Sequence, residues 1–456
     1  MLGGVVVALG SAATLAVASQ RIQAEQAAFR TPSASRCYPS TLNAPATLAG
    51  TNVSVSPLPN SYDASSHAQI SMVGASAQSL SHVRVSGSDS GSHGGHLRAY
   101  SQGDGASFVP SKPFSQGETV TVRGEVSAAG RARRFAYRFV VATKDVLPYL
   151  PQPPPSGKDY NEKQHFRSAP SLEAPLLNIS ANTPQASPGD IFAAPYSGPG
   201  PPGPMIVDGA GNLVWFDPLS TKVGAAANLQ VQQLGDKPVL TWWQGYIPPQ
   251  GFGQGEEIIY NTAYQQIGRV HAGNGYKADL HEFKLTPQGT ALLTVFAPID
   301  CDLSVVGGPS GGSVTDSIFQ EIDLRTSLVR REWHSLDHVA LGDSYSTPTG
   351  SSAAWPYDYF HINSIDQRAD GTTLISARNT WALYVTNTAN GSVQSAIGGK
   401  RSSSKLGAGT HTAYQHDATT LANGTISVFD NGAVPKVHPQ SRGLVLSLGG
   451  GTVSAV

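Results

Sequence analysis

A short unit that recurs in the second half of the chain places the strongest limit on how this sequence can fold. Each copy is a polar turn with glycine that leads directly into a short apolar run, and the copies lie at residues 208–216, 287–295, 370–375 and 423–428. Such a unit cannot bury the faces of its strands alone, and stacking several units around an axis as a β-propeller solves that problem. The repeat therefore predicts a propeller, and two packed β-sandwiches are the alternative that the pattern leaves open.

The composition favours strands over helices. The 456 residues include 49 glycines and 32 prolines, and 13% of the residues are charged, which is about half the usual share. Many turn-forming residues, few charges and no sustained helical period are typical of an all-β protein with many short strands. A chain of this length has room for two or three domains, and up to six propeller blades of roughly 40 to 50 residues fit into its second part.

The first part of the chain has the pattern of a separate β unit. Short runs of alternating apolar and polar residues lie between residues 42 and 145, and strands of this kind bury one face and expose the other. The pattern predicts a small N-terminal β-sandwich at 42–145. A proline-rich stretch at 146–160 is typical of a stiff linker, so we place the propeller domain at 161–456.

Residues 1–19 form a small, apolar segment that ends in Ala16, Val17 and Ala18. This pattern predicts a signal peptide with cleavage near Ala18, or a membrane anchor if the segment is retained. In either case we expect an exported protein that is extracellular or associated with the cell surface. Contact with a membrane is expected only through this segment.

Charge and cysteine content exclude several other partners. The net charge is -1, and without a long basic run the chain lacks the usual features of a nucleic-acid-binding protein. Cys37 and Cys301 are the only two cysteines. They lie far apart in the sequence, so we do not expect them to form a disulfide, and two cysteines cannot form a thiolate metal cage.

Four side chains that can perform chemistry recur at corresponding places in the repeated unit: His281, His361, Arg378 and His416. Blade loops of a propeller converge on its central channel, so these side chains are expected to meet there. Arginine offers a planar fork for two oxygens of a sulfate or phosphate group. A neutral imidazole can attack sulfur or phosphorus, and a protonated one can stabilise the leaving oxygen. The set therefore indicates a site for an anionic tetrahedral ester.

The same residues also allow other interpretations. Each could be an ordinary polar residue bonded within its own blade. Three histidines also suit a catalytic zinc ion, and His334 and His338 are spaced like a ligand pair. That pair lacks the glutamate of a zinc protease motif, and Arg378 would repel a cation, so we expect no metal. A serine hydrolase is not expected, because no Gly-x-Ser-x-Gly elbow lies between an expected strand and an expected helix.

The same residues carry a resemblance to a known family. The chain resembles the arylsulfate sulfotransferase (arylsulfotransferase) family from about residue 166 to residue 447, and the motifs that carry the resemblance lie at 203–216, 279–283, 360–364, 376–379, 398–400 and 415–418. Residues 87–91 and 113–118 look like parts of the domain that precedes the propeller in exported bacterial members.

The resemblance implies a six-bladed propeller with a sulfate site in its central channel. It implies transfer of a sulfuryl group from an aryl sulfate donor to a phenolic acceptor, without the nucleotide donor PAPS and without a cofactor. His416 matches the histidine that is transiently sulfated in a two-step ping-pong cycle. His281 and His361 match the pair that binds sulfate and assists the phenolic oxygens, and Arg378 matches the sulfate-binding arginine.

Three further residues are assigned to substrate binding: Asn363, Tyr359 and Trp381. The aromatic rings of the last two can stack on aryl groups, although packing in the core would explain them equally well. The chain departs from the family pattern because 391–399 lacks an expected tryptophan and Val456 comes earlier than the usual end. We therefore expect a propeller that is C-terminally incomplete. A non-catalytic exported propeller that binds aromatic or anionic ligands, and a surface scaffold, remain alternatives.

Overall fold

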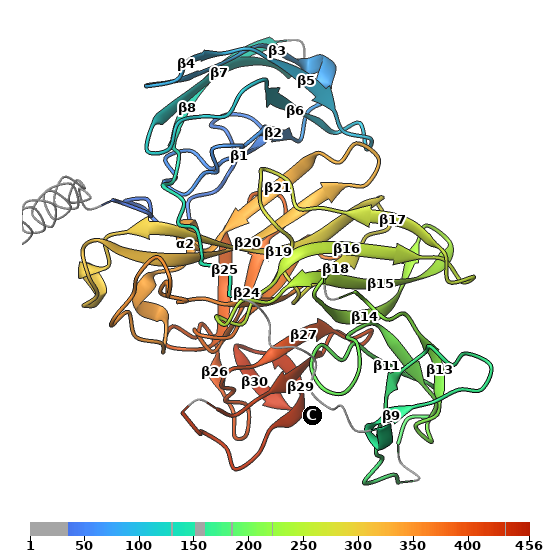
Figure 1. The fold of residues 1–456 in the computed structure, drawn as a ribbon. Coiled ribbons are helices and arrows are strands. Elements are labelled where there is room, and N and C mark those ends of the chain that lie inside the picture. The colour runs from blue at the N-terminus through green and yellow to red at the C-terminus, as the bar shows by residue number, and fades with distance from the viewer. Residues whose placement is uncertain (1–34, 129–130, 151–159, 184–185, 221, 434) are drawn as a thin grey trace, which may run out of the picture.

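The computed structural model describes residues 35–128, 131–150, 160–183, 186–220, 222–433 and 435–456 (Figure 1). The segment expected to direct export and most of the proline-rich linker lie outside the described residues. Within these ranges the regular structure is almost entirely β, which confirms the all-β prediction. The exceptions are one helical turn and four 3-10 turns: α2 (Ser335–His338), η1 (Ala77–Ser79), η2 (Tyr160–Glu162), η3 (Ser304–Val306) and η4 (Leu341–Asp343).

Two four-stranded antiparallel sheets make up the N-terminal unit, drawn in blue and cyan in Figure 1. Their orders are β1-β2-β6-β5 and β4-β3-β7-β8. Side chains from both sheets enter one buried cluster, for example Ile70 and Phe108 from the first sheet and Val122 and Phe139 from the second. The strands are β1 (Ser54–Ser56), β2 (Ile70–Val73), β3 (Leu80–Gly87), β4 (Gly91–His93), β5 (Gly95–Ala99), β6 (Gly105–Pro110), β7 (Thr119–Ala128) and β8 (Arg131–Val140).

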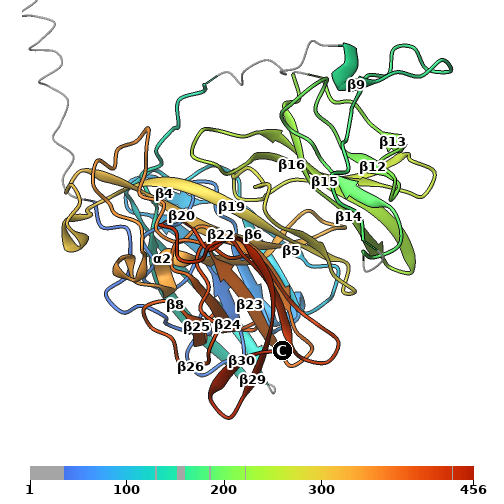
Figure 2. The same cartoon turned by 90° about the horizontal axis from the view of Figure 1, so that it is seen from below.

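The rest of the described chain forms a small pair of strands and five larger sheets. Most of these sheets are antiparallel meanders, in which strands that follow one another in sequence are hydrogen-bonded neighbours. Successive sheets lie side by side in chain order, because β14 contacts β11 and β18, and β22 contacts β19 and β27 (Figures 1 and 2).

The bounds of these strands follow in sheet order. The first three groups are β9 (Lys163–Gln164) with β10 (Ala174–Pro175); β11 (Ile191–Ala193), β12 (Met205–Val207) and β13 (Leu213–Phe216); and β14 (Ala225–Leu234), β15 (Lys237–Tyr246), β16 (Gln254–Tyr260) and β17 (Gln266–Val270). The next two are β18 (Phe283–Leu285), β19 (Thr290–Cys301), β20 (Gly312–Asp323) and β21 (Val329–His334); and β22 (Ile362–Gln367), β23 (Thr372–Ala377), β24 (Ala382–Asn387) and β25 (Val393–Gly398). The last is β26 (Lys405–Leu406), β27 (His416–Thr420), β28 (Ile426–Asp430), β29 (Arg442–Gly449) and β30 (Thr452–Ala455).

All four copies of the repeated unit form a turn followed by a strand, as the sequence predicts. The strands that follow the four turns are β13, β19, β23 and β28. Glycine is needed in these turns because Gly211, Gly289, Gly371 and Gly424 have φ between 74° and 84°, where a Cβ atom would be strained. No helix within the described ranges is long and apolar enough to cross a membrane.

Cys37 and Cys301 form a disulfide, so the expectation that they would not pair was wrong. The two residues are separated by 264 positions, and sequence spacing alone does not reveal such a contact. The bond joins the start of the described chain to the end of β19, where the backbone N–H of Asp302 also donates a 2.8 Å hydrogen bond to the carbonyl of Ser35. Both cysteines are buried, with 1% of their surface exposed.

Replacing Cys37 by serine is expected to lower the free energy of unfolding by about 2–5 kcal/mol, because a bond that closes such a long loop restricts the unfolded chain. Guanidinium unfolding of the variant and the wild type, both without reductant, measures the difference. Reductant should destabilise the wild type and leave the variant unchanged. Equal unfolding midpoints for oxidised and reduced wild type would contradict this prediction.

Candidate active site

The structure brings the four predicted side chains His281, His361, Arg378 and His416 together because of where they lie on their strands. His281 precedes β18, His361 precedes β22, and His416 opens β27, so each histidine lies at the start of the first strand of its meander. Arg378 directly follows β23, which runs antiparallel to β22 and therefore ends beside the start of β22. The ring centroid of His281 lies 5.0 Å from that of His361 and 5.9 Å from that of His416.

His281 is oriented by the buried carboxylate of Asp279. Oδ2 of Asp279 lies 2.8 Å from Nδ1 of His281 and accepts hydrogen bonds from Oγ1 of Thr294 at 2.9 Å and from the backbone N–H of His281 at 3.0 Å. Oδ1 accepts one from the backbone N–H of Gly253 at 2.5 Å. Burial opposes ionisation of Asp279, but the charge of His281 and these hydrogen bonds outweigh it and lower the pKa of the carboxyl. Because Nδ1 is engaged, Nε2 is the nitrogen left for a ligand.

His361 has a corresponding carboxylate partner and a cationic neighbour. Its Nδ1 is hydrogen-bonded to Oδ2 of Asp358, while Nη1 of Arg378 lies 3.3 Å from Nε2. Burial lowers the pKa of His361, and the positive charges of His281 and Arg378 lower it further. The charge of Asp358 acts in the opposite direction but does not outweigh them. His361 is therefore neutral at neutral pH.

His416 combines a neutral ring with two polar contacts at Nδ1. Its Nδ1 lies 3.0 Å from the carbonyl oxygen of Tyr414, which also accepts a hydrogen bond from Nδ2 of Asn431. Nδ2 of Asn431 also lies 3.0 Å from Nδ1. The carbonyl can only accept a hydrogen bond, so the tautomer with its proton on Nδ1 satisfies it and leaves the lone pair on Nε2. Burial, followed by the charge of His281, lowers the pKa of His416 to about 3. This imidazole has the protonation state that a nucleophile needs.

Backbone geometry at the site is unusual for residues other than glycine. His361, Trp381, Tyr414 and Asp417 all have left-handed φ values, between 53° and 58°. Such residues persist only where the surrounding structure holds them, and they concentrate at functional sites. His361 is itself a site residue, Asp417 directly follows His416, and Tyr414 and Trp381 lie two and three positions from His416 and Arg378, so the strain lies where these side chains are positioned.

Arg378 extends from the histidines towards an open cavity. The cavity has a volume of about 290 Å³, and Arg378, Asp358, Tyr414 and Trp355 are among the residues that line it. The guanidinium carbon of Arg378 lies 4.7 Å from the centre of the Tyr414 ring. An anionic group at Arg378 would thus have aromatic surface beside it and open space for the rest of a ligand.

The three residues assigned to substrate binding have different surroundings. Tyr359 is fully buried in the core, and its hydroxyl donates a 3.3 Å hydrogen bond to the carbonyl of Val339. The expectation that it stacks on a substrate ring is therefore wrong. Asn363 is buried and donates from Nδ2 to the carbonyl of Gln415 at 3.0 Å, which ties β22 to the residue before His416. Trp381 stacks on Tyr345 with ring centroids 3.8 Å apart and lies 6.3 Å from Tyr414.

Sequence reasoning missed the residues that orient the histidines: Asp279, Asp358 and Asn431. A signal was present for the first two, because an aspartate occurs two positions before His281 and three positions before His361. Asn431 gave no such signal, since it reaches the carbonyl that fixes His416 from the end of the neighbouring strand β28.

The three histidines could also act as metal ligands, because nitrogen atoms from all three lie within 4.8 Å of one another. Their Nδ1 atoms are held by oxygen acceptors, an arrangement that metal-binding histidines share. However, Nη1 of Arg378 lies 3.3 Å from Nε2 of His361 and places a permanent positive charge where a cation would sit. The electrostatics favour an anion at this point.

Acidification is expected to destabilise the protein through its buried neutral imidazoles. The pKa of His416 is lowered from 6.5 to about 3, and that of His361 is also lowered, both by burial. At pH values between the lowered pKa of the folded protein and the ordinary pKa of histidine, the unfolded chain therefore binds more protons than the folded protein. The free energy of unfolding should decrease as the pH is lowered, by up to about 1.4 kcal/mol per pH unit for each such histidine. Urea unfolding between about pH 7 and pH 4 should give a shallower slope for His416→Ala than for the wild type. Identical slopes would contradict this assignment.

One family model matches the part of the chain in which the three histidines and Arg378 lie. The family model described as arylsulfotransferase (ASST) matches residues 230–449, a range that includes all three histidines and Arg378. No curated protein matches the chain. A protein of unknown function from Bacteroides caccae is 12% identical, over 59% of this chain and 73% of that chain, with a TM-score of 0.34. A rhamnogalacturonan lyase from Bacillus licheniformis is 10% identical, over 92% and 83%, with a TM-score of 0.24. Both TM-scores are too low to support an argument about fold or function.

Proposed function

We propose, from the match of residues 230–449 to the arylsulfotransferase family model, that the protein moves a sulfuryl group from an aryl sulfate ester to a phenolic acceptor through a sulfohistidine at His416. The observation that supports this proposal most strongly is the neutral His416 ring. Its lone pair is on Nε2, and it shares one cluster with His281, His361 and Arg378. The reaction requires no nucleotide donor and no cofactor.

In the first half-reaction, Nε2 of His416 attacks the sulfur atom while the bond from sulfur to the aryl oxygen breaks. Arg378, whose Nη1 lies 3.3 Å from Nε2 of the neighbouring His361, donates hydrogen bonds to the sulfuryl oxygens, where negative charge must be stabilised. A protonated His281 donates its Nε2 proton to the departing phenolate, which leaves as a phenol. The sulfated His416 ring keeps its Nδ1 proton on the Tyr414 carbonyl, and this oxygen stabilises the positive charge of the ring.

In the second half-reaction, a phenol occupies the space that the first product has left. The neutral His281 accepts the proton of this phenol, and the phenolic oxygen attacks the sulfur atom. The bond from sulfur to Nε2 of His416 breaks, which restores the neutral imidazole and the protonated His281. Asp279 keeps the ring of His281 oriented through both half-reactions because its carboxylate lies 2.8 Å from Nδ1. The cavity beside Arg378 and Trp355 offers a route for the aryl groups.

We propose in addition that the successive meanders are blades of a propeller at 161–456, preceded by a β-sandwich at 42–145, and that the protein is exported. The contacts of β14 with β11 and β18, and of β22 with β19 and β27, support the propeller, and the buried cluster shared by the two N-terminal sheets supports the sandwich. The disulfide between Cys37 and Cys301 supports export, because such bonds persist in oxidising compartments.

The test of this function is the release of nitrophenol from nitrophenyl sulfate with and without added phenol. Release is expected to rise with phenol concentration, because the sulfated enzyme turns over slowly until an acceptor arrives. A peptide containing His416 should gain the mass of one sulfuryl group when the donor is added alone. A folded protein that releases no nitrophenol and gains no such mass would contradict the proposal and would favour a binding propeller.

A further inference from the structure

A second cluster of metal-ligating side chains lies away from the three active-site histidines, where the N-terminal unit meets β20 and β21. Asp63 lies between β1 and β2, Asp316 belongs to β20, and His334 ends β21. Ligand atoms of all three residues lie within 4.8 Å of one another. All three are buried, with at most 3% of their surface exposed.

The geometry around His334 is that of an oriented ligand. Its Nδ1 lies 2.6 Å from Oδ2 of Asp316 and 3.7 Å from Oδ2 of Asp63, and its Nε2 lies 3.0 Å from Oε1 of Glu332. Oδ1 of Asp316 accepts a 3.0 Å hydrogen bond from Oγ of Ser335. A carboxylate on the far nitrogen of a histidine, and a hydrogen bond on the far oxygen of a carboxylate, are the outer contacts that fix ligands at metal sites.

The cluster also contains buried oxygen atoms that the protein leaves without a partner. Oδ2 of Asp63 and Oδ1 of Asp337 are both buried and accept no hydrogen bond from any described residue. Asp337 interacts electrostatically with Asp63, Asp316 and His334. Four buried carboxyl groups, counting Glu332, thus surround a single imidazole, and buried carboxylates are normally paired or bound to a metal ion.

We propose that Asp63, Asp316 and His334 bind one divalent first-row metal ion, Zn²⁺ or Mn²⁺, and that this ion fastens the N-terminal unit to β20 and β21. When the metal ion binds Nδ1 of His334, it displaces the proton that Nδ1 otherwise donates to Oδ2 of Asp316. One proton is therefore released for each ion bound. One imidazole nitrogen with carboxylate oxygens suits these ions, whereas Ca²⁺ prefers a larger set of oxygen ligands. The ion has a structural role because its ligands are buried and distant in sequence.

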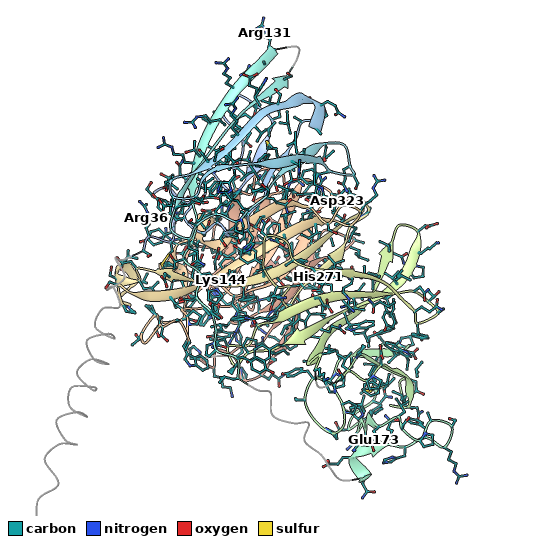
Figure 3. All side chains as sticks on the ribbon, turned by 45° about the horizontal axis from the view of Figure 1, so that its top comes forward. Arg36, Arg131, Lys144, Glu173, His271 and Asp323 are labelled. Carbon is teal, nitrogen blue, oxygen red and sulfur yellow. A yellow bond between two sulfur atoms is a disulfide. The ribbon has the colours of Figure 1, made fainter. Side chains whose placement is uncertain are left out.

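Other contacts between the same parts provide a matched control. Asp104 in the N-terminal unit forms a 2.9 Å ion pair with Arg330 of β21. Ser101 donates hydrogen bonds to Asp323 at the end of β20, and Asp323 is labelled in Figure 3. These contacts cross the same interface without involving the proposed ligands. Asp104→Asn therefore removes one ion pair from the interface and leaves the metal cluster intact.

The experiment measures the metal content of the full chain by elemental analysis after expression with Zn²⁺ or Mn²⁺ in the medium. Wild type, Asp104→Asn and His416→Ala should each retain about one ion per chain, whereas Asp63→Asn should retain none. The His416→Ala variant excludes binding at the active-site histidines as the source of the metal. A wild type without stoichiometric Zn²⁺ or Mn²⁺, or equal metal in Asp63→Asn, would overturn the proposal.

Stability provides a second readout in case Asp63→Asn does not fold. Wild type, unfolded without reductant in the presence of a chelator, is refolded with Zn²⁺, Mn²⁺, Ca²⁺ or no added ion. The melting temperature should be several degrees higher with Zn²⁺ or Mn²⁺ than with Ca²⁺ or no ion. Equal melting temperatures in all four samples would mean that protons, and not a metal ion, neutralise the cluster.

Discussion

Replacing His416 by alanine is expected to lower the rate of nitrophenol release from nitrophenyl sulfate by a factor on the order of 10⁴ or more, because the variant has no atom that can accept the sulfuryl group. The fold should persist. His416 is only partly buried, and the polar contacts of its ring are with the Tyr414 carbonyl and the Asn431 side chain, both at Nδ1. Steady-state release with saturating phenol, together with circular dichroism and a melting curve, measures both effects.

His411 supplies the control for this prediction, because it is an exposed histidine five positions before His416 in the same loop. His411→Ala should release nitrophenol at the wild-type rate. If His416→Ala kept more than about a tenth of the wild-type rate, the sulfuryl group would have to transfer directly to the acceptor or to a different residue. The proposed intermediate would then be wrong even if the sulfotransferase activity were real.

Replacing Asp279 by alanine is expected to lower the free energy of unfolding by about 3–5 kcal/mol, the usual effect of removing one partner of a buried charged pair. The carboxylate accepts hydrogen bonds from the backbone N–H of Gly253, from Oγ1 of Thr294, and from the backbone N–H and the ring Nδ1 of His281. Its loss leaves these buried donors unpaired. Guanidinium unfolding measures the change, and nitrophenol release should fall as well because the ring of His281 is no longer oriented.

Asp236 provides the comparison for Asp279. It is an exposed aspartate in the turn between β14 and β15, and Asp236→Ala should change the free energy of unfolding by no more than about 0.5 kcal/mol. An Asp279→Ala variant as stable as this control would show that water or a rearranged side chain satisfies the buried donors. Normal turnover in a folded Asp279→Ala variant would show that proton transfer by His281 does not depend on this carboxylate.

The sequence by itself determined the features that depend on neighbouring residues. Glycine turns with positive φ and the apolar runs after them specify β13, β19, β23 and β28, because both signals act within a few residues of the chain. His281, His361 and His416 were recognisable because they occupy corresponding positions in repeated units, and equivalent strands of a repeat start at the same end of neighbouring sheets. The resemblance to the arylsulfotransferase family used the same local motifs.

The tertiary structure alone decided the contacts between residues that are distant in sequence. Cys37 meets Cys301 across 264 positions, and Asp63 reaches His334 only when the N-terminal unit lies on β20 and β21. Tyr359 is next to the active-site residues in sequence but points into the core, because the irregular segment before β22 lacks the alternation that separates the two faces of a strand. Packing of whole sheets sets these positions, and no local pattern encodes how sheets pack.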